Sequence, residues 1–154
     1  MVNSLRKLQR LSGRDQLLLV KAWLLLPATV LLLRILGLRG CQRVLARLAG
    51  SPPEPNQRPG AQLESCIAAG RLVRAAARFS PLRAACLPQS LTLLRLLRRK
   101  GVVVELRIGV RTEAGRLGAH AWVEYQGCPL NDDMAIAERF HPFVALHDLA
   151  GERA

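Results

Sequence analysis

Three residues of types that act together in nucleophilic catalysis follow one another along the chain: Cys86, His120 and Asp132. Cys86 stands where a helix is predicted to begin, and the dipole and unpaired backbone amides of a helix start favour the thiolate, the nucleophilic form of cysteine. His120 opens a predicted strand and could take the thiol proton, and a carboxylate on the following strand could orient its ring. The spacing therefore predicts a nucleophile, a general base and an orienting acid.

The turn after the histidine strand decides which carboxylate faces the ring. A two-residue turn at residues 126–127 would place His120 opposite Asp133 and turn Asp132 away from it. A three-residue turn would put Asp132 on the same face as His120. The alternation of side chains along a strand is compatible with both registers.

The elements that must position these residues follow from hydrophobic period and from breaker residues. Helices are predicted over residues 16–37, 39–48, 61–79 and 86–99, and strands over residues 102–110, 119–125 and 128–132. Residues 112–118 indicate a loop, and the chain after Asp133 indicates a short helix or loop. A chain of 154 residues is long enough for one core with an appended helical region.

A proline-rich segment, residues 51–60, divides the chain. Its prolines fix φ and remove backbone donors, so the segment through Pro59 and Gly60 is predicted to be a non-helical linker. The linker separates an N-terminal helical arm, residues 1–50, from the remaining core, residues 61–154.

The helical arm is strongly apolar. The apolar run between Lys21 and Arg34 is short and contains Pro27, so we expect a buried or docking helix, with membrane contact a lesser alternative to a protein partner. The segment before it, residues 1–14, is polar and basic, and no cleavable signal peptide is visible, which favours the cytoplasm.

Charge and cysteine usage narrow the function classes. The net charge of +12 is concentrated in the first hundred residues, and a field of this sign could steer an acidic partner, an anionic membrane or nucleic acid. The basic half lacks interleaved aromatic residues and a recognition motif, so no nucleic-acid partner is expected. The four cysteines are widely spaced without a C-x-x-C pair, which indicates free thiols.

Four short segments carry a resemblance to a known family. Residues 86–90 (CLPQS) precede a leucine-rich helix, residues 108–110 (IGV) end a strand, residues 119–124 (AHAWVE) open the next one, and residues 130–132 (LND) follow Gly127. Together they resemble the transglutaminase-like leader peptidases of lasso-peptide biosynthesis over roughly the last two-thirds of the chain. An apolar helical arm is also of the kind that precedes this core in that family.

The resemblance implies an α+β papain-like core, in which a helix bearing cysteine packs on a small antiparallel sheet. It also implies a Cys-His-Asp triad that cleaves the leader from a ribosomally made precursor peptide. Carried over, Cys86 is the nucleophile, His120 the general base and Asp132 the orienting acid, with Asp133 as its reserve. No cofactor and no metal are implied.

The resemblance further implies two protein partners. One is a separate small leader-recognition protein, because a helical N-terminal region leaves no room for the sheet of that domain. The other is an ATP-dependent, asparagine-synthetase-like lasso cyclase, onto which the apolar arm is expected to dock.

Other residues have structural interpretations. Trp122 is expected to be a core or pocket wall and Glu124 a pairing residue, and only the backbone amide of Cys86 suggests itself as an oxyanion donor. Three rival functions remain: a transglutaminase-like scaffold that binds a partner without cleaving it, a basic nucleic-acid-binding protein, and a zinc site formed by Cys86, His120 and Cys128, whose spacing matches no structural finger.

Overall fold

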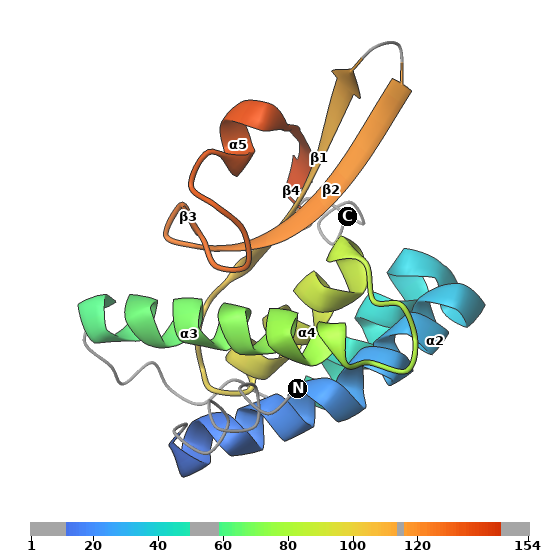
Figure 1. Ribbon diagram of the computed structural model, residues 1–154. Helices are drawn as coiled ribbons and strands as arrows, with labels where there is room; N and C mark the ends of the chain where they lie inside the picture. The colour runs from blue at the N-terminus through green and yellow to red at the C-terminus, as the bar shows by residue number, and fades with distance from the viewer. Residues whose placement is uncertain (1–11, 50–58, 114–115, 146–154) are drawn as a thin grey trace, which may run out of the picture.

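The computed structural model describes residues 12–49, 59–113 and 116–145, and Figure 1 shows long helices on one side of the molecule with a sheet above them. The elements run in the order α2 (Gly13–Ala49), α3 (Pro59–Arg78), α4 (Cys86–Arg98), β1 (Glu105–Glu113), β2 (Arg116–Tyr125), β3 (Cys128–Pro129), α5 (Ile136–Arg139) and β4 (His141–Ala145). The strands form one antiparallel sheet in the order β3-β2-β1-β4. The predicted α+β class, with a helix bearing cysteine on a small antiparallel sheet, is confirmed.

Helix α4 joins the helical layer to the sheet. It contacts α2 and α3 on one side and β1 and β2 on the other. Its buried leucines, Leu91, Leu93 and Leu97, belong to a single apolar core that also holds residues of α2, α3 and the sheet. The buried hydroxyls of Thr29 on α2 and Thr92 on α4 lie 3.2 Å apart and form a hydrogen bond inside this core. The inner side of the helical arm is therefore part of the same core.

Helix α2 bends at Gly37, where φ is 65° and ψ is −175°. A positive φ favours glycine because a Cβ atom would crowd the backbone there. The predicted boundary between a long apolar helix and a shorter basic one, near residues 37–39, is confirmed by this break. Pro27 lies inside the first part of α2 without ending it.

The segment Gly13–Cys41 of α2 is long and apolar enough to cross a membrane, and a stretch of 18 residues within it has a mean hydropathy of 2.0. This finding rests on length and composition alone, and a partly buried core helix meets the same criteria. Only about 20 Å of helix separates Lys21 from Arg34 at the usual rise of 1.5 Å per residue. The hydrocarbon core of a bilayer is about 30 Å thick, so a spanning helix would bring at least one of these cations inside it.

Helix α3 begins at Pro59, inside the segment predicted to be a non-helical linker. That part of the prediction is wrong for Pro59 and Gly60. Proline is tolerated in the first turn of a helix, where its missing N–H would have had no intrahelical partner. The rest of the predicted linker, residues 51–58, lies outside the described residues.

The hairpin of β1 and β2 differs from the prediction at both ends. It starts at Glu105 rather than at residue 102, because Val102 N donates to Leu97 O at 3.1 Å and closes the end of α4 instead. It also extends to the pair Glu113 and Arg116, so most of the predicted loop at residues 112–118 is strand. These residues are mostly polar or exposed, and backbone pairing continues there without a burial pattern that the sequence could reveal.

The remaining strands also differ from the prediction. β3 ends at Pro129 rather than at residue 132. β4, which was not predicted, pairs with the free edge of β1, with a register shift between Ile108 and Gly109. The short helix α5 agrees with the predicted short helix or loop after Asp133.

Candidate active site

Cys86 is the first residue of α4, and its half-buried side chain faces β2. The thiol is hydrogen-bonded to the His120 side chain and to the backbone amides of Ala121 and Leu87. The hydrogen bond with His120 makes the largest contribution to lowering the pKa of the Cys86 thiol, and the two amides add to it against the opposing effect of burial. The surroundings of Cys86 therefore favour the thiolate.

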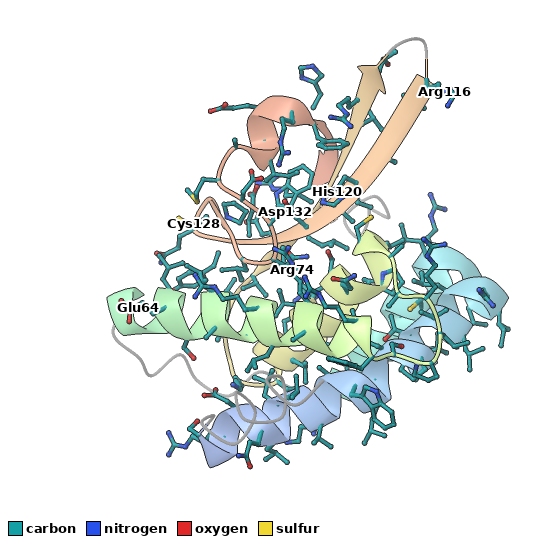
Figure 2. The ribbon with its side chains drawn as sticks, in the orientation of Figure 1. Glu64, Arg74, Arg116, His120, Cys128 and Asp132 are labelled. Carbon is teal, nitrogen blue, oxygen red and sulfur yellow. The ribbon has the colours of Figure 1, made fainter. Side chains whose placement is uncertain are left out.

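His120 lies on β2 between the thiol and a carboxylate. Its Nε2 atom is 2.6 Å from Oδ2 of Asp132, and Figure 2 shows the two side chains together where the sheet faces the helices. Nε2 faces the carboxylate, so Nδ1 is the ring nitrogen left for Cys86. The pKa of His120 is raised, first by its hydrogen bond with Cys86 and further by Asp132, although burial opposes the shift. The pair is thus biased toward thiolate and imidazolium.

Alkylation of Cys86 by iodoacetamide should proceed below the pH range of an ordinary thiol, because the thiolate reacts and the pKa of Cys86 is lowered. In the His120→Ala variant the hydrogen bond that lowers this pKa most is absent, so the midpoint of the rate-versus-pH profile should move to higher pH. Mass spectrometry of the peptide containing Cys86 measures the rate at each pH. Equal midpoints in the two proteins would contradict this assignment.

The edge of β2 explains how the nucleophile is held near the histidine. β3 spans only two residues, so it leaves the edge of β2 at Ala121 without a strand partner. Helix α4 takes the place of that strand: Ser90 Oγ donates to Ala121 O at 2.9 Å, and the Ala121 amide donates to the Cys86 sulfur. Both backbone groups of one residue are satisfied by α4. The strand that presents His120 therefore also fixes the start of the helix.

The side chain of Asn131 takes the place of a strand partner at Val123, the next residue of β2 whose backbone groups face this edge. Its Oδ1 atom accepts the backbone N–H of Val123 at 2.8 Å, and its Nδ2 atom donates to Ser90 Oγ at 3.0 Å. Leu130 N donates to Val123 O at 2.9 Å and completes the pairing. Asn131 and Ser90 are both buried. One amide side chain thus links α4, β2 and the segment that carries Asp132.

Replacing Asn131 with alanine should lower the free energy of unfolding by about 2–3 kcal/mol, since the buried Val123 amide would lose its partner and Ser90 a hydrogen bond. Chemical denaturation followed by circular dichroism measures the loss. Asp133→Ala serves as the control, because Asp133 is an exposed neighbour and its loss should cost under about 1 kcal/mol. Equal stability of the Asn131→Ala variant and the wild type would show that this network is not structural.

The turn after β2 has the two-residue register, in which a regular third strand would turn Asp132 away from His120. Residues 126–127 form a two-residue turn with φ values of 51° and 78°, and Tyr125 lies opposite Cys128. A regular third strand in this register would have turned Asp132 away from the histidine. β3 ends at Pro129, however, so side-chain alternation stops before Asp132 is reached. The chain leaves the sheet and brings the carboxylate back to the ring.

Asp133, the reserve carboxylate, has other partners. Its Oδ1 atom accepts the backbone N–H of Ala135 at 3.1 Å, and its Oδ2 atom pairs with Arg139 at 2.6 Å. The other oxygen of Asp132 lies 3.9 Å from the same guanidinium. Asp133 therefore shapes the turn before α5, and Asp132 is the carboxylate that contacts His120.

Trp122 and Glu124 line the site from the same strand as His120. The buried indole ring stacks near His120, with ring centroids 6.2 Å apart and planes 19° apart. Its Nε1 atom donates to Glu124 at 2.7 Å, and Glu124 also accepts from Arg107 at 3.0 Å. The predictions of a wall for Trp122 and a pairing role for Glu124 are confirmed.

Phe140 and Gly109 complete this wall. The Phe140 ring centroid lies 5.2 Å from that of His120. A Cβ atom on Gly109 would lie 2.8 Å from Cβ of Phe140 and 2.9 Å from the Trp122 ring. Glycine at this position therefore allows both rings to pack beside the histidine.

Four residues that support the site were assigned no role in it from the sequence: Ser90, Asn131, Phe140 and Gly70. Ser90 lies four residues after Cys86, and this helical spacing places both on one face, so the sequence held a usable signal. Gly70 lies on α3, where an added Cβ atom would be 2.0 Å from Leu130 O. Because Gly70 has no side chain, α3 can pack closely against the segment before Asp132. No local sequence pattern indicates this contact.

Among the described residues, no group of three or more histidine, cysteine, aspartate or glutamate side chains could hold a metal ion. The alternative zinc set of Cys86, His120 and Cys128 does not form such a group. In Figure 2, Cys128 lies at the end of the sheet near β3, apart from the label of His120.

A comparison with protein-family models gives a match that includes the residues of this site. The family model of the transglutaminase-like superfamily matches residues 23–145, which include Cys86, His120 and Asp132. The match begins within α2 and ends with β4, so it covers helical arm and sheet together. No curated protein and no solved structure matches the chain.

Proposed function

The chain belongs to the transglutaminase-like superfamily and has its cysteine-protease-like fold, and on this basis we propose that it is a cytoplasmic cysteine peptidase that removes the leader of a ribosomally made lasso precursor peptide. The observation that carries the proposal is the contact chain from Cys86 through His120 to Asp132. The resemblance of residues 86–90, 119–124 and 130–132 to lasso leader peptidases supports the choice of substrate.

The proposed reaction uses the charge distribution of the site. The Cys86 thiolate attacks the carbonyl carbon of the bond between leader and core, and the imidazolium of His120 gives its proton to the departing core amine. This leaves the leader as a thioester on Cys86. His120 then takes a proton from water, whose oxygen attacks the thioester, and the leader leaves with a new carboxylate while the sulfur returns to its starting state.

The remaining residues hold this machinery in place. Asp132 keeps the ring oriented with Nδ1 toward the sulfur and stabilises the imidazolium. The amides of Ala121 and Leu87 stabilise the thiolate before attack and after release. No cofactor or metal takes part in the proposed reaction.

Two partners belong to the proposal. A separate small leader-recognition protein delivers the precursor peptide, and an ATP-dependent, asparagine-synthetase-like lasso cyclase uses the freed core amine.

The test is to incubate the protein with precursor and leader-recognition protein in water enriched in oxygen-18. Mass spectrometry should show separate leader and core peptides, with one heavy oxygen in the new carboxylate of the leader at the enrichment of the solvent. In a parallel incubation with an added primary amine, leader joined to that amine would indicate acyl transfer rather than hydrolysis. Intact precursor in the presence of its partner would refute the peptidase assignment and favour a binding scaffold.

A further inference from the structure

The outer side of α2 is apolar although nothing in the described part of the chain covers it. Five of the seven large exposed residues described in α2 lie on this side and are each between 48% and 76% exposed: Leu17, Val20, Leu24, Leu31 and Ile35. The other two, Trp23 and Leu36, are 43% and 46% exposed and lie about 100° and 120° around the helix axis from Leu24. At 100° per residue the first five side chains fall on one stripe along the helix. The buried residues of α2, among them Ala22 and Leu26, fall on the opposite side. We call this stripe the outer face of α2.

Cations flank the outer face on both sides. Lys21 and Arg14 lie about 60–80° around the helix axis from Leu24 in one direction, and Arg34 lies about 80° in the other. All three cations are exposed, and Asp15 is the sole acidic residue within the bounds of α2. Their long side chains can reach along an apolar surface and keep their charges at its rim.

We propose that the outer face of α2 binds the surface of a membrane that contains anionic phospholipids, with the helix lying in the plane of the interface. An apolar stripe bordered by lysine and arginine is the pattern by which helices bind such surfaces. Anionic headgroups complement the flanking cations, and acyl chains receive the leucine and isoleucine side chains. This proposal assigns the outer face of α2 to a membrane surface in place of the cyclase that is expected there from the sequence. The interaction is independent of the proposed peptidase activity.

Charge argues against one other arrangement, and core packing argues against a second. A second copy of the chain seated on the outer face would bring Lys21 and Arg34 of both copies together in a protein of net charge +12. A membrane-spanning α2 would have to leave the core and separate the hydrogen-bonded hydroxyls of Thr29 and Thr92. Binding from one side leaves both the core and the active site unchanged.

The test measures co-sedimentation of the full chain with phosphatidylcholine vesicles, with and without phosphatidylglycerol. We expect binding to the anionic vesicles that is released by a carbonate wash. The double variant Leu24→Gln/Ile35→Gln should lower the partition coefficient about 100-fold, or about tenfold for each apolar side chain lost. Its matched control, Val103→Gln/Leu117→Gln, removes two exposed apolar residues outside α2, 79% and 74% exposed, and should bind like the wild type.

Charge is tested separately. Lys21→Gln/Arg34→Gln should weaken binding to anionic vesicles about 25-fold, or about fivefold for each cation, and Arg71→Gln/Arg116→Gln should have a much smaller effect. Failure to bind anionic vesicles, or equal losses in the apolar variant and its control, would overturn the proposal. Resistance to carbonate would indicate a spanning helix. A wild-type dimer in sedimentation equilibrium that Leu24→Gln/Ile35→Gln converts to monomer would identify a second copy as the occupant, and either result would also overturn the proposal.

Discussion

Replacement of Cys86 with alanine should lower kcat/KM for leader removal by about 10⁵-fold or more, the scale seen when an enzyme loses its nucleophile. Without the sulfur, no thioester can form, and water would have to attack the peptide bond directly. The loss is measured as the initial rate at which free core peptide appears by mass spectrometry, with precursor and leader-recognition protein held constant.

Cys128→Ala is the matched control for this variant. Cys128 is also a free, half-buried thiol, but it lies on β3 and the described contacts do not connect it to His120. The control should keep wild-type activity within about twofold. Undiminished turnover by the Cys86→Ala variant would show that the precursor is cleaved without a thioester on Cys86, and would exclude the proposed chemistry.

Asp132→Ala and Asp133→Ala, changes at adjacent positions, should separate catalysis from structure. Loss of Asp132 should lower kcat/KM by about 10²–10⁴-fold, because the ring of His120 loses the partner 2.6 Å from Nε2 that orients it toward the thiol. Loss of Asp133 should lower it by less than about fivefold, since that residue contacts Ala135 and Arg139. Steady-state kinetics on the precursor, with folding checked by circular dichroism, measure both.

An Asp132→Asn variant would show which property of the carboxylate matters. The amide oxygen can still accept a hydrogen bond from the ring, whereas the negative charge is lost. Substantial activity in this variant would indicate orientation as the main contribution, and activity as low as that of Asp132→Ala would indicate charge. If Asp133→Ala were instead the more damaging change, the assignment of the orienting acid would be wrong.

The short third strand is central to the geometry of this site. A strand continuing to residue 132 would have paired with β2 at Ala121 and occupied the edge that α4 uses. It would also have turned Asp132 away from His120 in the observed register. Because β3 ends at Pro129, the edge of β2 remains open to α4, and Asp132 can face His120. The buried side chains of Ser90 and Asn131 satisfy the backbone groups of β2 that have no strand partner at this edge.

Several local features of this protein could be predicted from neighbouring residues. They are the helix starting at Cys86, the glycine break in α2 and the presence of a strand soon after α4, although not its first residue. These features depend on spacing and breaker residues over a few positions. The order of Cys86, His120 and Asp132 pointed to the same chemistry that their contacts now support.

How these elements meet depends on contacts between residues far apart in the chain. The choice between Asp132 and Asp133 depends on where a strand ends, which is set by competition between a strand and α4 for the edge of β2. The addition of β4 to β1 and the close approach of α3 at Gly70 join positions far apart in the chain. No local pattern reports such contacts, because their free energy arises only when distant backbone groups find each other as partners.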